Sequence, residues 1–320
     1  MPESPPVPAV PYPSRTILGF GLLCTVLLAL SAWLPERAHQ PLSAATAALT
    51  AMLLAFCGAA PVLQGAHLSL GGCQVVIVPE CTGLYPTLLF CSFLAACPAS
   101  LRTKASGMAL GAAALNAANI ARIAAVIALG SRWPALFEIA HVYLAQILMV
   151  LLVFLACLIW LNRERSGGHP ASFALRAALL VSILFLPWLA LNRLYVASLD
   201  RLVQVAHALL WPGFILNTPL PFAIYNHTFA VPLFVALVAA TPGLSWHRKL
   251  ITLAAGVLAI AAWHASFRGT HVLWTAHGVD AMLNVHQVVY LLGQYLLPVL
   301  LWLPAFSGHT RASASSGVRS

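Results

Sequence analysis

The chain has 320 residues, of which 61% are hydrophobic and only 7% are charged, and its formal net charge is +9. Soluble domains carry roughly 25% charged residues, so this composition excludes a soluble enzyme and indicates a polytopic membrane protein. The basic residues fall mostly in short loops between apolar segments, where they act as topology signals rather than as a nucleic-acid site. Membrane lipids are therefore the first partner that the sequence implies, and nucleic acid is not one.

Apolar segments extend over nearly the whole length and predict an all-α integral membrane fold with about eight or nine transmembrane helices. Residues 1–15 are rich in proline and are expected to form a flexible tail, as are residues 307–320 on the cytoplasmic side. The predicted spans are residues 16–34, 42–63, 83–98, 105–130, 136–161, 172–196, 228–240, 249–267 and 284–305.

Lys and Arg in the short loops predict which side of the membrane each loop occupies. The loop 64–82 contains neither residue and is predicted to lie outside the cytoplasm. Arg132 in a predicted outer loop and Arg15 near the amino terminus favour other arrangements, so the helix count and the side of the amino terminus stay open. The basic residues predicted to be cytoplasmic are Arg102, Lys104, Arg163, Arg165, Arg248, Lys249, Arg311 and Arg319.

The outer loop between the second and third predicted spans ends in the best candidate for chemistry. Residues 67–78 form two short β-prone runs around Gly71-Gly72, which predicts a small hairpin. The hairpin leads into the segment 79–83, Pro-Glu-Cys-Thr-Gly, which places Cys81 where a helix begins. A thiol at a helix N-terminus is biased toward the nucleophilic thiolate, and free amides there can hold an oxyanion. A disulfide with Cys73 is the structural alternative.

Further polar residues follow at membrane depth. Asn116, Asn119 and Arg122 are spaced by three in an apolar helix and project from one face. An arginine near the bilayer centre costs roughly 2.5–3.5 kcal/mol, so Arg122 must face protein or a hydrated cavity. The returning helix carries Glu138 and His141. At about 1.5 Å per residue, Arg122 and His141 both lie about 10–12 Å from the outer helix ends.

Cys81, His141 and Arg122 together provide what nucleophilic acyl transfer needs. His141 can act as general base and acid, and Arg122 can hold a substrate carboxylate or carbonyl or stabilise the thiolate. Convergence requires a re-entrant start of the third helix, because Cys81 is predicted nearer the membrane surface than the other two. The structural alternatives are a pair of Arg122 with Glu138, and a packed His141 bonded to Glu138 or Tyr143.

Three motifs in this order resemble the exosortase and archaeosortase family of membrane transpeptidases over about residues 60–162. They are the segment 79–84, Pro-Glu-Cys-Thr-Gly-Leu, the segment 116–123 that ends in Asn-Ile-Ala-Arg-Ile, and His141. The resemblance implies cleavage of carboxy-terminal sorting tails (PEP-CTERM-like) at the outer face of the cytoplasmic membrane, with transfer to an unidentified surface acceptor. It implies the catalytic set Cys81, Arg122 and His141, without a cofactor or metal.

The same resemblance implies a domain organisation. Residues 16–165 are expected to form the exosortase-like membrane core, and residues 166–306 an additional transmembrane region of unknown role. Many members of the family place more helices before the cysteine motif, whereas only two are predicted here.

A non-enzymatic membrane protein is the alternative function, either a transporter or a metal-binding assembly factor in which Arg122 and His141 line a path. The carboxy-terminal third is rich in histidine, which invites a metal hypothesis, but the spacing matches no compact ligand motif. No clear inverted repeat relates the two halves. The residues concerned are His227, His264, His271, His277, Asp280 and His286.

Overall fold

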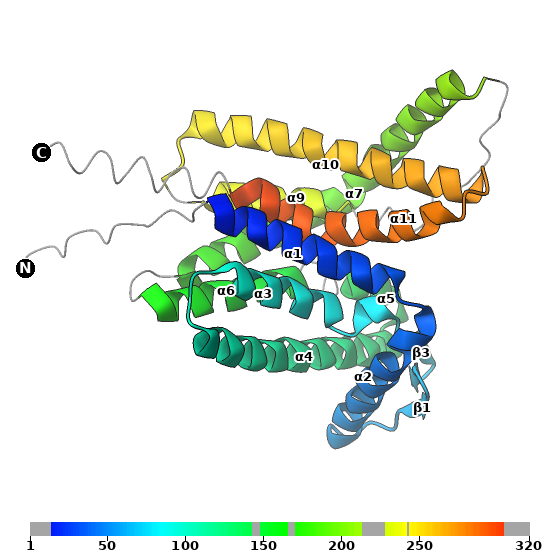
Figure 1. Cartoon of the computed structure of the whole chain (residues 1–320). Helices are drawn as coiled ribbons and strands as arrows, with labels where there is room; N and C mark the ends of the chain where they lie inside the picture. The colour runs from blue at the N-terminus through cyan, green and yellow to red at the C-terminus, as the bar shows by residue number, and fades with distance from the viewer. Residues whose placement is uncertain (1–13, 143–147, 166–169, 213–227, 242, 304–320) are drawn as a thin grey trace, which may run out of the picture. The chain divides into compact units, whose positions relative to one another are not determined.

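The computed structural model is predominantly helical and describes residues 14–142, 148–165, 170–212, 228–241 and 243–303 (Figure 1). It confirms the predicted all-α membrane fold with a small hairpin before Cys81. The two predicted tails, residues 1–15 and 307–320, lie outside the described residues except for Ser14 and Arg15, which already belong to helix α1.

The chain forms two compact units, each of which is described by itself. One consists of residues 23–157 and the other of residues 1–22 and 158–320. The domain limits expected from the sequence, residues 16–165 and 166–306, stay a prediction.

The unit 23–157 contains a three-stranded antiparallel sheet of order β1-β2-β3, with helices before and after it in the chain. Helix α1 (Ser14–Trp33) enters this unit at residue 23, and helix α6 (Met149–Arg165) leaves it after residue 157. The elements between them are α2 (Glu36–Phe56), β1 (Val62–Gln64), β2 (His67–Leu70), β3 (Cys73–Val76), the 3₁₀ turn η1 (Pro79–Cys81), α3 (Leu84–Ala96), α4 (Leu101–Arg132) and α5 (Pro134–Val142).

The other unit is built from apolar helices of different lengths. Its described elements after α6 are α7 (Pro170–Leu210), α9 (Ala230–Ala240), α10 (Trp246–Thr275), α11 (Ala281–Leu291) and the π-helical turn η3 (Leu292–Leu296).

The expected count of eight or nine spans is not confirmed. Among the described helices, four are long and apolar enough to cross a membrane, or five if a pair bent by 48° is counted as one span. Two of the predicted spans form helices too short to cross alone, because α3 has 13 residues and α9 has 11. The spans found are Arg15–Trp33, Leu101–Arg132, Leu175–Leu210, Trp246–Thr275 and the bent pair Ala281–Gln294 with Leu297–Leu303.

The predicted hairpin is present and fixes the register of the sheet. Gly71 and Gly72 have φ values of 54° and 88°, which a two-residue turn with the hairpin twist requires and which glycine adopts without strain. The turn pairs Leu70 with Cys73, and β1 adds to the far side of β2. Strand β3 is therefore an edge strand of the sheet that the structure describes.

A small apolar core joins this sheet to helices α2 and α4. Leu68 and Ile77 are 1% and 3% exposed and pack with residues of both helices. The core positions the end of β3 over α4, so the chain that follows reaches the helix carrying Arg122. The helical residues of the core are Ala47, Ala51, Leu54, Ile123, Ala124 and Ile127.

Candidate active site

The segment after β3 forms a single 3₁₀ turn that holds Cys81. The Cys81 amide donates a hydrogen bond to the Val78 carbonyl at 2.8 Å, and the Thr82 hydroxyl donates one to the Pro79 carbonyl at 2.7 Å. Pro79 stands at the start of the turn, where a missing N–H costs nothing. These local bonds set the backbone of the half-buried Cys81 before α3 begins.

Two asparagines of α4 hold this turn and the start of α3 against the helix. Asn119 Nδ2 donates a hydrogen bond to the Cys81 carbonyl at 2.7 Å, and Asn116 Nδ2 donates one to Thr87 Oγ1 at 3.1 Å. Asn119 is 2% exposed. Buried amides in an apolar helix require such partners, so the two asparagines explain how Cys81 reaches the turn of α4 that carries Arg122.

Gly83 allows the close approach of the cysteine turn to α4. Its φ is +76°, in the left-handed region that favours glycine. A Cβ at this position would lie 3.0 Å from Asn116 Oδ1 and 3.4 Å from Asn119 Cβ. Both the backbone and the space therefore disfavour a side chain at residue 83.

We expect Gly83→Ala to destabilise the protein more than Gly58→Ala. Gly58 has a similar φ of +85°, but a Cβ there would meet nothing within 4 Å. In both variants the left-handed backbone lowers the free energy of unfolding by about 1 kcal/mol. Only Gly83→Ala also crowds the two asparagines, which lowers it further by about 1–3 kcal/mol. The apparent melting temperatures in detergent at one scan rate measure the difference, and equal losses would contradict a close packing role for Gly83.

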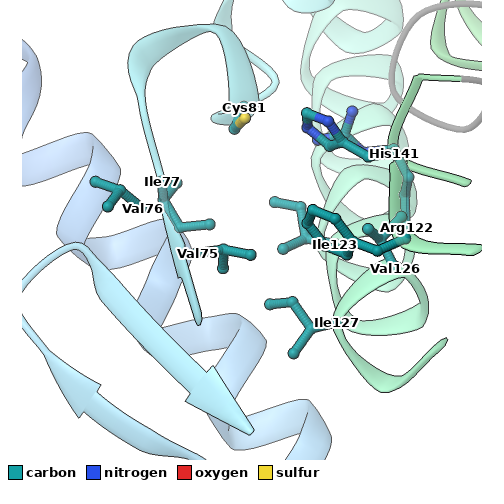
Figure 2. A pocket seen from close by; sticks show the side chains of 10 residues that line it. Val75, Val76, Ile77, Cys81, Arg122, Ile123, Val126, Ile127 and His141 are labelled. Carbon is teal, nitrogen blue, oxygen red and sulfur yellow. The ribbon is translucent and has the colours of Figure 1, made fainter. Parts of the chain in front are cut away.

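The three residues singled out in the sequence meet at one cavity. Cys81, Arg122 and His141 line a space of about 40 Å³ between the end of β3, helix α4 and helix α5. In Figure 2 the side chains of Cys81 and His141 extend toward this space from opposite walls. The rest of the lining is apolar and consists of Val75, Val76, Ile77, Ile123, Val126, Ile127 and Phe137.

The sequence predicted a Cys81 thiol biased toward the thiolate form. This prediction was wrong. Burial raises the pKa of the Cys81 thiol above its ordinary value, and the Glu80 carboxylate raises it further. The charge of Arg122 and its hydrogen bond to the thiol lower this pKa, but by less than burial raises it. The thiol is consequently protonated at neutral pH, and nucleophilic attack requires a base.

The rate of Cys81 alkylation by iodoacetamide is expected to keep rising as the pH increases past about 8.5, the ordinary pKa of a thiol. No plateau is expected below that pH. In Arg122→Gln the pKa rises further, because the lost positive charge had favoured the thiolate, so the profile moves to higher pH. Mass spectrometry of the Cys81 peptide follows the reaction, with the exposed Cys57 as a reagent control. A plateau below pH 7 would show an ionised thiol and contradict the buried, protonated form.

The structural alternatives for Cys81 and His141 were a disulfide with Cys73 and a packed, hydrogen-bonded histidine. Cys73 and Cys81 form no disulfide. Cys73 lies instead against the end of α4, where its sulfur would be 2.9 Å from a Cβ added to Gly130. The His141 ring stacks on Phe137, with centroids 5.8 Å apart. The side chain of Glu138 and all of Tyr143 fall outside the described residues, so the pairs proposed for them are not tested.

The carboxy-terminal histidines lie in the other unit and bond within it. His264 Nδ1 is 2.8 Å from the Tyr195 hydroxyl, and His207 Nε2 is 2.8 Å from His277 Nε2. No group of three His, Cys, Asp or Glu side chains able to hold a metal occurs among the described residues, which exclude His227. The described part of the chain therefore lends no support to the metal-binding alternative.

An ion pair in the same unit was not predicted from the sequence. Arg268 is fully buried in α10, and its Nε donates to Asp200 Oδ1 at 2.8 Å, while its Nη1 lies 2.8 Å from His271 Nδ1. An arginine inside a long apolar helix is the signal that would have indicated it.

Comparison with known protein families matches residues 12–150 to the family described as transmembrane exosortase (Exosortase_EpsH). The matched segment is a little under half of the chain and supports membership of the exosortase family. It supports a membrane-embedded sorting transpeptidase in general, acting on carboxy-terminal sorting signals. Searches among curated proteins and among solved structures found no match.

The matched region contains the whole candidate site. Cys81, Asn119, Arg122 and His141 all fall within residues 12–150, as does the hairpin. Helices α7, α10 and α11 lie beyond it, so the family match carries no information about the ion pair and histidines of the other unit.

Proposed function

We propose that this protein is an exosortase, a cysteine transpeptidase that cleaves PEP-CTERM-like carboxy-terminal sorting tails at the outer face of the cytoplasmic membrane. The observation that carries the proposal is the single cavity lined by Cys81, Arg122 and His141. The site lies toward the end of α4 opposite to Arg102 and Lys104. The positive-inside rule assigns those two residues to the cytoplasm, which supports an outward-facing site.

The reaction begins with the protonated thiol of Cys81. His141 takes the proton while the sulfur attacks the scissile carbonyl, so no stable thiolate is needed. The carbonyl oxygen becomes an oxyanion, and the Arg122 guanidinium stabilises its charge. Collapse of the tetrahedral intermediate breaks the C–N bond, and the His141 imidazolium returns the proton to the leaving amine. The products are a thioester on Cys81 and a released tail.

The second half of the reaction frees the enzyme. An acceptor nucleophile at the surface, or water, attacks the thioester carbonyl while His141 takes its proton. Arg122 again faces the oxyanion, and expulsion of the sulfur with return of the proton regenerates the Cys81 thiol. Transfer and hydrolysis differ only in the attacking group.

Mass spectrometry of the processed protein tests this mechanism. A reporter fused to a PEP-CTERM-type tail is incubated with the purified exosortase in lipid nanodiscs, with and without hydroxylamine. A thioester predicts a hydroxamate at the new carboxyl end in the presence of hydroxylamine, and a free acid or an acceptor adduct in its absence. Cleavage that never gives a hydroxamate, with no acyl adduct on Cys81, would contradict the covalent mechanism.

A further inference from the structure

Strand β3 has a free edge beside the candidate site. The Ile77 amide donates to the Ala66 carbonyl at 2.9 Å, which makes that pair a hydrogen-bonded one. Because such pairs alternate along an antiparallel ladder, the N–H and C=O groups of Val76 and Gln74 point away from β2. No strand pairs with that side of β3 in the described part of the chain, and Val76 is 50% exposed.

The same strand forms one wall of the cavity that holds the reactive groups. Val75, Val76 and Ile77 line it on one side, and apolar residues of α4 and α5 line the other. Figure 2 shows these residues below Cys81 and His141, with Ile127 at the lower end. The strand with the unpaired edge thus lines the same cavity as the thiol.

We propose that the free edge of β3 binds the segment of the sorting tail next to the scissile bond as an added strand. The proposal rests on the proposed function. Extended peptides add to exposed sheet edges through main-chain hydrogen bonds, while pockets select alternate side chains. A helical segment keeps its carbonyls in its own hydrogen bonds, so pairing with β3 holds the substrate in the form that exposes a carbonyl to Cys81.

This placement also predicts which side chains of the substrate fit the site. Alternate residues of the added strand point toward the apolar wall of Ile123, Val126 and Ile127, because side chains of a strand alternate between its faces. The cavity is about 40 Å³ in volume and mostly apolar, so we expect it to accept small apolar side chains. Exposed sheet edges invite unwanted pairing, so an unprotected edge beside a reactive cysteine is consistent with a binding role.

Proline substitution of Val76 tests the edge with matched controls. Val76→Pro removes the outward N–H, whereas Val76→Ala keeps it. Leu63→Pro places a proline at the outward position of β1, the other free edge of the same sheet, away from the cavity. With a PEP-CTERM-type tail peptide as probe, we expect kcat/KM to fall at least about tenfold in Val76→Pro, mainly through KM. Leu63→Pro stays within about twofold of the unchanged protein. Val76→Ala measures the loss that the shortened side chain causes in the cavity, and kcat/KM in Val76→Pro is expected to lie at least about tenfold below that of Val76→Ala.

The outcomes separate this proposal from the proposed function. Equal processing by Val76→Pro and Val76→Ala overturns the edge-strand proposal, while loss of processing in Cys81→Ala would leave the transpeptidase standing. Retained processing in Cys81→Ala ends both. Alkylation of Cys81 at an unchanged rate in Val76→Pro shows that the site is still folded.

A second measurement leaves strand β3 unchanged. Each amide of the tail peptide near the scissile bond is N-methylated in turn, and binding to Cys81→Ala is measured. Pairing with β3 predicts weakened binding at every second position, because only alternate amides of a strand face its neighbour. Losses of equal size at successive positions, or no losses, would overturn the added strand.

Discussion

Cys81→Ala is expected to abolish processing of a sorting tail, with a loss of about 10⁴-fold or more, as for removal of other catalytic nucleophiles. The variant loses only the sulfur. The Asn119 bond to the backbone carbonyl of residue 81 and the 3₁₀ turn do not involve the thiol, so the fold is expected to remain. A shift in mass of a tail reporter, followed in cells and with purified protein, measures the loss.

Cys73→Ala is the matched control for this substitution. Cys73 lies in the same hairpin region and packs against the end of α4, but it does not line the cavity. Its replacement is expected to leave processing within about threefold, the range of a modest packing defect. Processing that survives in Cys81→Ala, or that disappears equally in Cys73→Ala, would end the assignment of Cys81 as the nucleophile.

Arg122→Gln is expected to lower kcat/KM by about 10²–10³-fold, the usual effect of losing a donor to a developing oxyanion. Glutamine keeps a polar side chain of similar length but removes the positive charge beside the thiol. The loss appears in kcat if Arg122 stabilises the transition state, and in KM if it holds a substrate carboxylate. Steady-state kinetics with a tail peptide distinguish the two roles.

Arg102→Gln removes the same charge from the exposed start of the same helix and serves as the control. We expect it to leave kcat and KM unchanged within about twofold, since surface charges contribute little to a distant site. Arg122→Lys keeps the charge without the planar group and is expected to recover only part of the activity. Full activity in Arg122→Gln would assign Arg122 a structural role.

The candidate site was largely predictable because the chain is so apolar. In a helix made mostly of alanine and other apolar residues, Asn116, Asn119 and Arg122 stand out, and their spacing by three already placed them on one face. The Gly-Gly pair likewise predicted the hairpin, because both positions need positive φ. The thiol's ionisation was not predictable, since burial depends on residues distant in the chain that cover Cys81.

The number of membrane spans was less predictable than the site. An apolar run has the same composition whether it crosses the bilayer alone or folds as a shorter helix packed against others. Helices α3 and α9 are such short helices. Hydropathy reports where a segment is apolar, whereas helix ends depend on turns and packing.

By itself, the amino-acid sequence determined the membrane class, the exosortase motifs and the three candidate catalytic residues, because each depends on residue types and spacing within short segments. The tertiary structure alone decided that Cys81, Arg122 and His141 share one cavity, that burial keeps the thiol protonated, and that β3 has a free edge beside it. The cavity and the burial depend on contacts between segments far apart in the chain, such as the hydrogen bond from Asn119 to the Cys81 carbonyl 38 residues away, which only the packed fold establishes.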